Sequence, residues 1–161
     1  MSITLEQSNK IIEAILQLAE KKQTRPITVL VVEPGCVPKA FQKEDGASMA
    51  RYEMAYGKCW AALALGRDSS LVRVRDEESP YFGKFLIAAS DDKLFPEGGG
   101  MQIRDEGGEV IGAVAVTGDT AKMDEDLARH GIQAAGLKID ADFEGKGRKF
   151  AIRRTKKEDG R

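Results

Sequence analysis

A run of six aliphatic and β-branched residues, from Ile27 to Val32, is the feature that most restricts how this chain can fold. The run is too apolar for a strand with one face in water, so it predicts a central strand that is covered on both faces. The sequence Glu33-Pro34-Gly35 then supplies a turn, and residues 37–42 are expected to return as an antiparallel partner strand. Any fold for this chain must therefore pack other elements against both sides of this strand.

Two segments have the spacing of apolar residues that is typical of helices. In residues 5–22 the apolar residues recur at helical spacing with polar residues on the other side, which predicts an amphipathic first helix with Ser2 or Thr4 as its cap. Residues 47–65 are apolar or small around most of the helical circumference, and Gly66 is placed to end this second helix. Because one sheet covers only one stripe of a helix, the pattern favours burial of the rest against a partner subunit.

The second half of the chain adds a hairpin and a helix. Residues 67–92 predict a charged surface excursion with short helices. Residues 101–104 and 110–116 predict a second hairpin, and residues 121–133 predict a last helix whose acidic side chains precede its basic ones, as the helix dipole favours. This order of elements predicts an α+β fold in which helices pack on an antiparallel sheet.

The length of 161 residues fits one domain, which we assign to residues 1–140, followed by a charged C-terminal extension at residues 141–161. A basic run from Lys146 to Lys157 is interrupted by apolar residues at 150–152. Such a run can contact nucleic acid or an acidic partner. We favour a solvated extension, or one that adds an edge strand or lies on a neighbouring subunit.

Charge and composition exclude several classes of protein. A formal net charge of −1 provides no long-range field for polyanions, so nucleic-acid binding by the bulk of the protein is not expected. The start of the chain lacks a secretory pattern and no apolar run is long enough to cross a bilayer, which predicts a cytoplasmic protein without membrane contact. Cys36 and Cys59 are expected to be free thiols. The scattered carboxylates lack metal-loop spacing, and a single histidine excludes zinc sites that need several imidazoles, so no metal site is predicted.

One candidate site is the junction of two glycine-containing turns. Glycines let the backbone approach a ligand, and the start of the last helix offers free N–H groups to an anion such as a carboxylate or phosphate. The alternative is a flexible loop next to a capped helix. The residues predicted to bind a ligand here are Gly98, Gly99, Gly100, Met101, Thr117, Gly118 and Thr120.

Lys58 is a second candidate because it interrupts an apolar helix. A partly desolvated ammonium can hold an anion, assisted by Arg51, or act as an acid with a lowered pKa. The alternative is a lysine that reaches the surface or pairs with Glu53 or Glu33. His130 can act as a proton shuttle or as an iron ligand, or it can simply cap the end of the last helix.

The order and spacing of four segments resemble the GlcG/HbpS-like family, which includes the C-terminal domain of PduO. The segments are Val29–Gly35, Ala55–Arg67, Gly98–Ile103 and Gly112–Gly118, within a region of similarity from residue 5 to residue 137. The resemblance implies a profilin-like sheet of about five strands, assembly into dimers or octamers, and haem or corrinoid binding in some members. Haem binding in this family is associated with a histidine in or near the first helix, and residues 5–22 contain none.

Two functions follow from these observations. The resemblance implies a small-molecule-binding protein, with haem or a related tetrapyrrole held in a groove between subunits and the sheet. The alternative is a cofactor-independent enzyme for a small organic acid, such as a catabolic intermediate, in which Lys58 and the glycine loop hold the anion and Glu33 or His130 moves protons. A purely structural homo-oligomer without a pocket is a third possibility.

Overall fold

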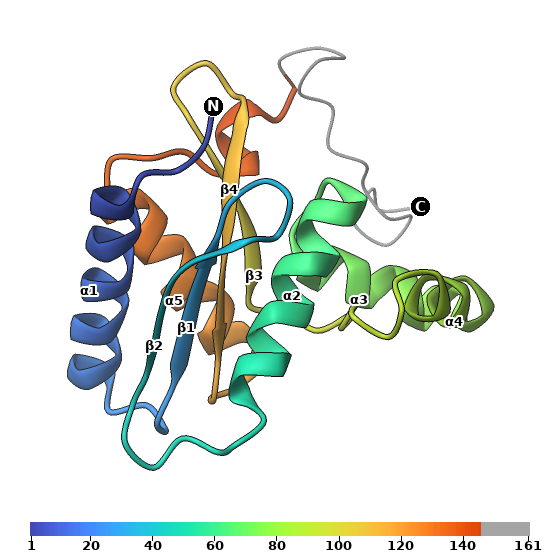
Figure 1. Ribbon diagram of the computed structural model, residues 1–161, viewed down its shortest axis with the longest axis horizontal. Helices are drawn as coiled ribbons and strands as arrows, with labels where there is room; N and C mark the ends of the chain where they lie inside the picture. The colour runs from blue at the N-terminus through green and yellow to red at the C-terminus, as the bar shows by residue number, and fades with distance from the viewer. Residues whose placement is uncertain (146–161) are drawn as a thin grey trace.

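Helices and strands follow one another along residues 1–145, the part of the chain that the computed structural model describes (Figure 1). The predicted basic run at residues 146–157 lies outside the described residues. The strands form one antiparallel sheet in the order β2-β1-β4-β3. The elements are α1 (Leu5–Lys22), β1 (Thr28–Val32), β2 (Pro38–Lys43), α2 (Arg51–Leu65), α3 (Ser69–Glu78), α4 (Pro80–Ala89), β3 (Gly100–Arg104), β4 (Val110–Thr117), α5 (Ala121–Ala134) and the 3-10 turn η1 (Asp140–Phe143).

The prediction of a central strand that is covered on both faces is confirmed. Every residue of β1 is buried, and the strand lies between β2 and β4. Within the described part of the chain the sheet has four strands, where about five were expected. Lys138 forms only an isolated bridge to Arg104 at the outer edge of β3, because the chain turns into η1 directly afterwards.

Helices α1 and α5 cover one face of the sheet. The side chain of Thr4 accepts a hydrogen bond from the backbone of Gln7 and the side chain of Gln7 accepts one from Thr4, a capping box that confirms Thr4 as the cap of α1. The two helices approach closely at Gly131, where an added Cβ would lie 2.6 Å from Cγ1 of Ile15. The main hydrophobic core lies between these helices and the sheet.

Helix α2 covers the opposite face, and other segments of the same chain cover part of its second side. The helix begins at Arg51 rather than at residue 47, and Gly66 ends it with a φ of 65°, as predicted. Its second side is covered by α3 and by residues 93–99, which pack so closely that a Cβ on Gly57 would lie 2.6 Å from Cβ of Phe95. The apolar circumference of α2 therefore does not by itself require a partner subunit.

Helix α4 extends from α3 at the end of the molecule, away from the sheet (Figure 1). It exposes three aromatic side chains, Tyr81, Phe82 and Phe85, of which Tyr81 is 86% and Phe85 66% accessible. No helix within residues 1–145 has the length and apolar character that crossing a membrane requires.

Candidate functional site

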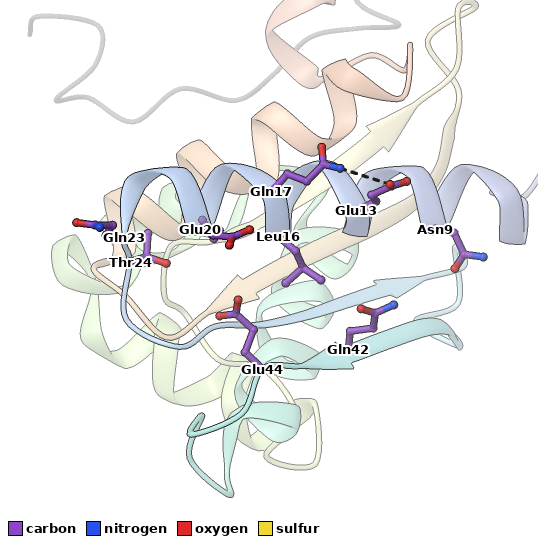
Figure 2. A pocket seen from close by; sticks show the side chains of 10 residues that line it. Asn9, Glu13, Leu16, Gln17, Glu20, Gln23, Thr24, Gln42 and Glu44 are labelled. Carbon is purple, nitrogen blue, oxygen red and sulfur yellow. Dashed lines mark hydrogen bonds between the residues drawn. The ribbon is translucent and has the colours of Figure 1, made fainter.

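Two of the concave surfaces of the described residues are lined by helices, one between α1 and β2 and the other between α3 and α5. The larger, which we call the α1–β2 groove, has a volume of about 660 Å³ (Figure 2). The smaller, which we call the α3–α5 pocket, has a volume of about 370 Å³ and includes Gly98 of the glycine loop. The groove is lined by Asn9, Glu13, Leu16, Gln17, Ala19, Glu20, Gln23, Thr24, Gln42 and Glu44, and the pocket by Ser70, Arg73, Glu97, Gly98, Ala121, Lys122, Glu125, Asp126 and Arg129.

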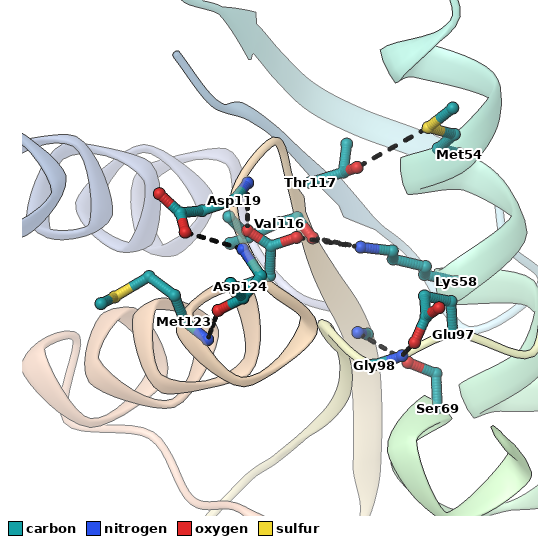
Figure 3. A network of polar contacts seen from close by, with 12 residues as sticks. Met54, Lys58, Ser69, Glu97, Gly98, Val116, Thr117, Asp119, Met123 and Asp124 are labelled. Atoms are coloured by element: carbon teal, nitrogen blue, oxygen red, sulfur yellow. Dashed lines mark hydrogen bonds and ion pairs between the residues drawn. The ribbon is translucent and has the colours of Figure 1, made fainter. Parts of the chain in front are cut away.

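The glycine loop, the end of β4 and Lys58 lie together, as Figure 3 shows. Lys58 Nζ donates hydrogen bonds to the carbonyl oxygen of Val116 at 3.0 Å and to Oδ2 of Asp124 at 3.2 Å. The backbone N–H of Val116 in turn donates to the carbonyl oxygen of Gly99 at 3.0 Å. Gly99 has a φ of 117°, and a Cβ there would lie 3.0 Å from Lys58 Nζ, so glycine is required for this approach.

The anion that Lys58 holds in this structure is the carboxylate of Asp124. Both side chains are almost fully buried, with 3% and 2% of their surfaces accessible. The prediction that Lys58 pairs with Glu53 or Glu33 is wrong: Glu53 is exposed on the first turn of α2, and Glu33 bonds elsewhere. Burial lowers the pKa of Lys58 and raises the pKa of Asp124, and their mutual attraction opposes both shifts.

Side chains of the protein itself occupy the N–H groups at the start of α5. Asp124 Oδ1 accepts from the backbone N–H of Asp119 at 3.0 Å, and Thr120 Oγ1 accepts from that of Met123 at 3.2 Å. Thr117 Oγ1 accepts from Nη1 of Arg51 at 3.0 Å. The Lys58–Asp124 pair therefore fastens α2, β4 and the start of α5 to one another in the interior.

The three residues proposed to act in catalysis do not meet. Glu33 follows the end of β1 that is opposite to the Thr28–Thr117 pair, and it accepts hydrogen bonds from Ser2 and Lys39. Five strand residues separate the two ends by roughly 15 Å. His130 is exposed on α5. It was predicted to lie in the last turn of this helix, but it lies in the turn before, because α5 continues to Ala134. The enzyme hypothesis therefore lacks a shared site for Lys58, Glu33 and His130.

The predicted ligand residues have different surroundings. Gly98 lines the α3–α5 pocket, whereas Met101 is fully buried in the core beneath α1 and α5. Gly100 donates its backbone N–H to Ser69 Oγ at 2.8 Å, and Gly118 is buried with a φ of 145°. Of these four residues, Gly98 alone lines one of the two concave surfaces.

Sequence reasoning missed the cationic residues of the α3–α5 pocket. Arg73 comes from α3 and Lys122 and Arg129 come from α5, and no motif links helices so far apart in the sequence. The helical spacing of Lys122 and Arg129, two turns apart, was the one available signal. Only the tertiary fold, which places residues of α3 and α5 around one pocket, brings the three residues together.

A second polar cluster at the edge of β3 holds η1 on the sheet. Arg104 Nε donates to Asp140 at 2.6 Å, and its other nitrogens donate to the carbonyl oxygen of Gly108 and to Gln102. Burial of the carboxyl group raises the pKa of Asp68, which lies nearby, to about 8. These contacts are internal, so we assign the cluster to the fold.

Comparison with known proteins identifies related sequences and folds. A family model described as haem degrading protein, HbpS-like, matches residues 3–133. The crystal structure of Klebsiella pneumoniae protein ORFY has a TM-score of 0.75 and 23% identity, over 83% of this chain and 90% of that one. A PduOC–haem complex has a TM-score of 0.76 and 21% identity, over 86% of this chain and 99% of that one. The structure of HbpS has a TM-score of 0.71 and 25% identity, over 83% and 89%. No curated protein matches the sequence.

Proposed function

This chain belongs to the HbpS-like family of haem degrading proteins, and from that membership we propose that it is a small-molecule-binding protein whose ligand carries an anionic group. The family match carries the proposal, because it runs from residue 3 to residue 133 and includes the sheet and nearly all of α5. The PduOC–haem complex supports it, since that protein of the same fold binds a small molecule. We also propose the profilin-like arrangement that the resemblance implies for the sheet.

The family implies haem or a related tetrapyrrole, so we tested whether the residues present fit haem iron. An axial ligand is usually histidine, cysteine, methionine or tyrosine. None of these lines the α1–β2 groove or the α3–α5 pocket, and His130, the single histidine, is exposed on α5 outside both linings. The residues of these two surfaces therefore do not fit a coordinated haem iron.

We expect a titration with hemin to leave the Soret band at the position of free hemin, both in the wild-type protein and in His130→Ala. The physical reason is the absence of an axial ligand from the two linings. Absorption spectroscopy measures the band directly. A shift in the wild-type protein that disappears in His130→Ala would contradict this expectation and assign His130 as an iron ligand.

The α3–α5 pocket suits a small carboxylate or phosphate. Its cations are now paired with acids of the protein, Arg73 with Glu97 at 3.5 Å and Arg129 with Glu125 at 2.9 Å. Surface pairs stabilise a protein by only about 0–1 kcal/mol each, and these two are partly exposed, so a ligand anion can displace the protein's own carboxylates at small cost. The volume of about 370 Å³ lies within the ordinary range for small-molecule sites.

A thermal-shift screen tests this pocket with inorganic phosphate and carboxylic acids of two to six carbons. A ligand at one hundred times its Kd stabilises the folded state by about 2.7 kcal/mol, which raises Tm by roughly 5–10 °C for a chain of this size. We expect Arg73→Gln/Arg129→Gln to abolish the rise and Lys21→Gln/Lys22→Gln, which removes two charges from α1, to retain it. No rise with any of these anions, or an equal rise in both variants, would remove the pocket assignment.

We further propose that a second copy of the chain covers the exposed aromatic side chains of α4. Tyr81, Phe82 and Phe85 lie next to one another on a helix that contacts mainly α3. A group of adjacent exposed aromatic residues is uncommon on monomers and is typical of interfaces. The exposed aromatic side chains of α4 are therefore the feature of the structure that supports a homo-oligomer.

Light scattering is expected to show at least a dimer for the wild-type protein at micromolar concentration and a monomer for Tyr81→Glu/Phe85→Glu. A dimer of this variant would bury two carboxylates without partners in the interface, which is unfavourable. Met49→Glu is the matched control, since Met49 is 93% accessible and lies outside α4. A monomeric wild-type protein, or a double variant with unchanged mass, would contradict the proposal.

A further inference from the structure

The described domain and the remaining C-terminal residues have opposite charges. Residues 146–161 contain eight lysine and arginine residues and two acidic residues, whereas residues 1–145 contain 17 basic and 24 acidic residues. The net side-chain charge is therefore +6 for residues 146–161 and −7 for residues 1–145, and the total of −1 conceals this difference. Opposite charges of this size attract each other over about a Debye length, roughly 8 Å at physiological salt.

The α1–β2 groove is the concave surface where this negative charge has no counterpart. Three of its ten lining residues are glutamates, Glu13, Glu20 and Glu44, and none is lysine or arginine. By contrast, the α3–α5 pocket has three basic residues beside its three acidic ones. Low-dielectric walls strengthen the field of charges that share a concave surface, so the groove favours a cationic occupant.

The shape of the groove is suited to an extended chain. It lies between α1 and β2 and is about 660 Å³ in volume, and Figure 2 shows Glu44 and Gln42 below α1 with Leu16 pointing toward them. A smaller recess, which includes Pro26, Lys43 and Asp45, shares Thr24 and Glu44 with it. Among the strands within residues 1–145, β2 pairs with β1 alone, so its outer backbone groups border the opening.

We propose that the C-terminal tail, residues 146–161, docks in the α1–β2 groove, with its lysine and arginine side chains against Glu13, Glu20 and Glu44. The tail follows η1, which contacts β3 at the other edge of the sheet. Three strand spacings, about 14 Å, separate β3 from β2, and the groove residues Gln42 and Glu44 lie roughly 15 Å further along the sheet, at the end of β1 where Thr28 is. A chain of 16 residues extends up to about 50 Å. The tail is therefore long enough to reach the groove of its own subunit, and equally that of a neighbouring copy.

Zero-length carbodiimide cross-linking of the full chain at low salt tests the proposal, because it joins lysine amines to carboxylates that are in contact. Mass spectrometry should find Lys146, Lys149, Lys156 and Lys157 joined to Glu13 and Glu20 in preference to other exposed carboxylates. These links should fall severalfold at about 1 M salt, where the Debye length is about 3 Å. Mixing labelled and unlabelled chains shows whether the tail docks within a subunit or between copies, and both results support the proposal.

Single substitutions separate docking from non-specific attraction. Glu13→Gln should weaken the link at Glu20 about twofold or more, and Glu20→Gln should do the same to the link at Glu13, because each removes one charge that holds the tail. The matched control Glu78→Gln removes an exposed charge from α3 and should leave both links unchanged. Links spread evenly over the acidic surface, or links that withstand both groove substitutions, would overturn the proposal.

Discussion

Replacing Lys58 with methionine is expected to lower the free energy of unfolding by about 3–5 kcal/mol at pH 8. The substitution leaves the carboxylate of Asp124 buried without a counter-charge, and removing one partner of a buried ion pair usually costs this much. A domain of ordinary stability has about 5–15 kcal/mol, so the variant should be close to unfolding. Urea denaturation of both proteins, followed by circular dichroism, measures the difference.

The loss should depend on pH in a direction that identifies its cause. Burial raises the pKa of Asp124, and loss of the Lys58 ammonium raises it further. A carboxyl group whose folded pKa is raised favours folding below its unfolded pKa and loses that contribution as the pH rises through the folded pKa. Lys58→Met should therefore approach the wild-type stability as the pH is lowered toward 4.

The double variant Lys58→Met/Asp124→Leu is the matched control. It removes both charges, and replacing a whole buried pair by apolar residues is often nearly neutral. We expect it to recover most of the stability that the single variant loses. A single variant that remains within about 0.5 kcal/mol of wild type at pH 8, or a double variant that is no more stable than the single one, would refute the structural role given to the pair.

Gly99→Ala is expected to cost about 3 kcal/mol or more, for two independent reasons. The φ of 117° is a conformation that residues with a Cβ rarely adopt, and such strain alone costs about 1–3 kcal/mol. In addition, the new Cβ would lie 2.5 Å from the carbonyl oxygen of Val116 and 3.0 Å from Lys58 Nζ. Overpacking of this kind adds typically about 1–3 kcal/mol.

Gly107→Ala provides the comparison for Gly99→Ala. Gly107 lies in the turn between β3 and β4, is exposed, and would place its Cβ no closer than 3.4 Å to a side-chain atom of Asp105. The free energy of unfolding of Gly107→Ala should stay within about 0.5 kcal/mol of the wild-type value. Equal stability of the two alanine variants in thermal and urea unfolding would show that Gly99 is not held as the structure describes.

Local sequence patterns predicted most of the elements because each pattern reflects short-range physics. The apolar run at Ile27–Val32 identified the buried central strand, and Thr4 and Gly66 identified the ends of two helices through hydrogen-bonding and φ preferences. The glycine loop, the end of β4 and Lys58 were correctly predicted to lie together. Their role as a ligand site stays a prediction.

Long-range packing decided what the sequence left open. The partner of Lys58, Asp124, is 66 residues away in the sequence, on α5, and only the tertiary fold brings the two side chains together. The loop at residues 93–99 that packs on α2 could not be foreseen for the same reason, since it has no apolar periodicity that links it to the helix. Burial of α2 against a partner subunit stays a prediction. The enzyme hypothesis joined Glu33 with Lys58 and the glycine loop, but the antiparallel register places Glu33 after the end of β1 that is opposite to the Thr28–Thr117 pair.

The family, the buried central strand and the helices that cover it could be predicted from the order of residues, because these features depend on the periodicity and composition of neighbouring residues. The fold was needed to show that Lys58 is neutralised inside the protein and that Arg73 and Arg129 line the same pocket. It also showed that no lysine or arginine of residues 1–145 lines the α1–β2 groove. Electrostatic pairing depends on distance and burial, and neither quantity can be read from the order of residues along a chain.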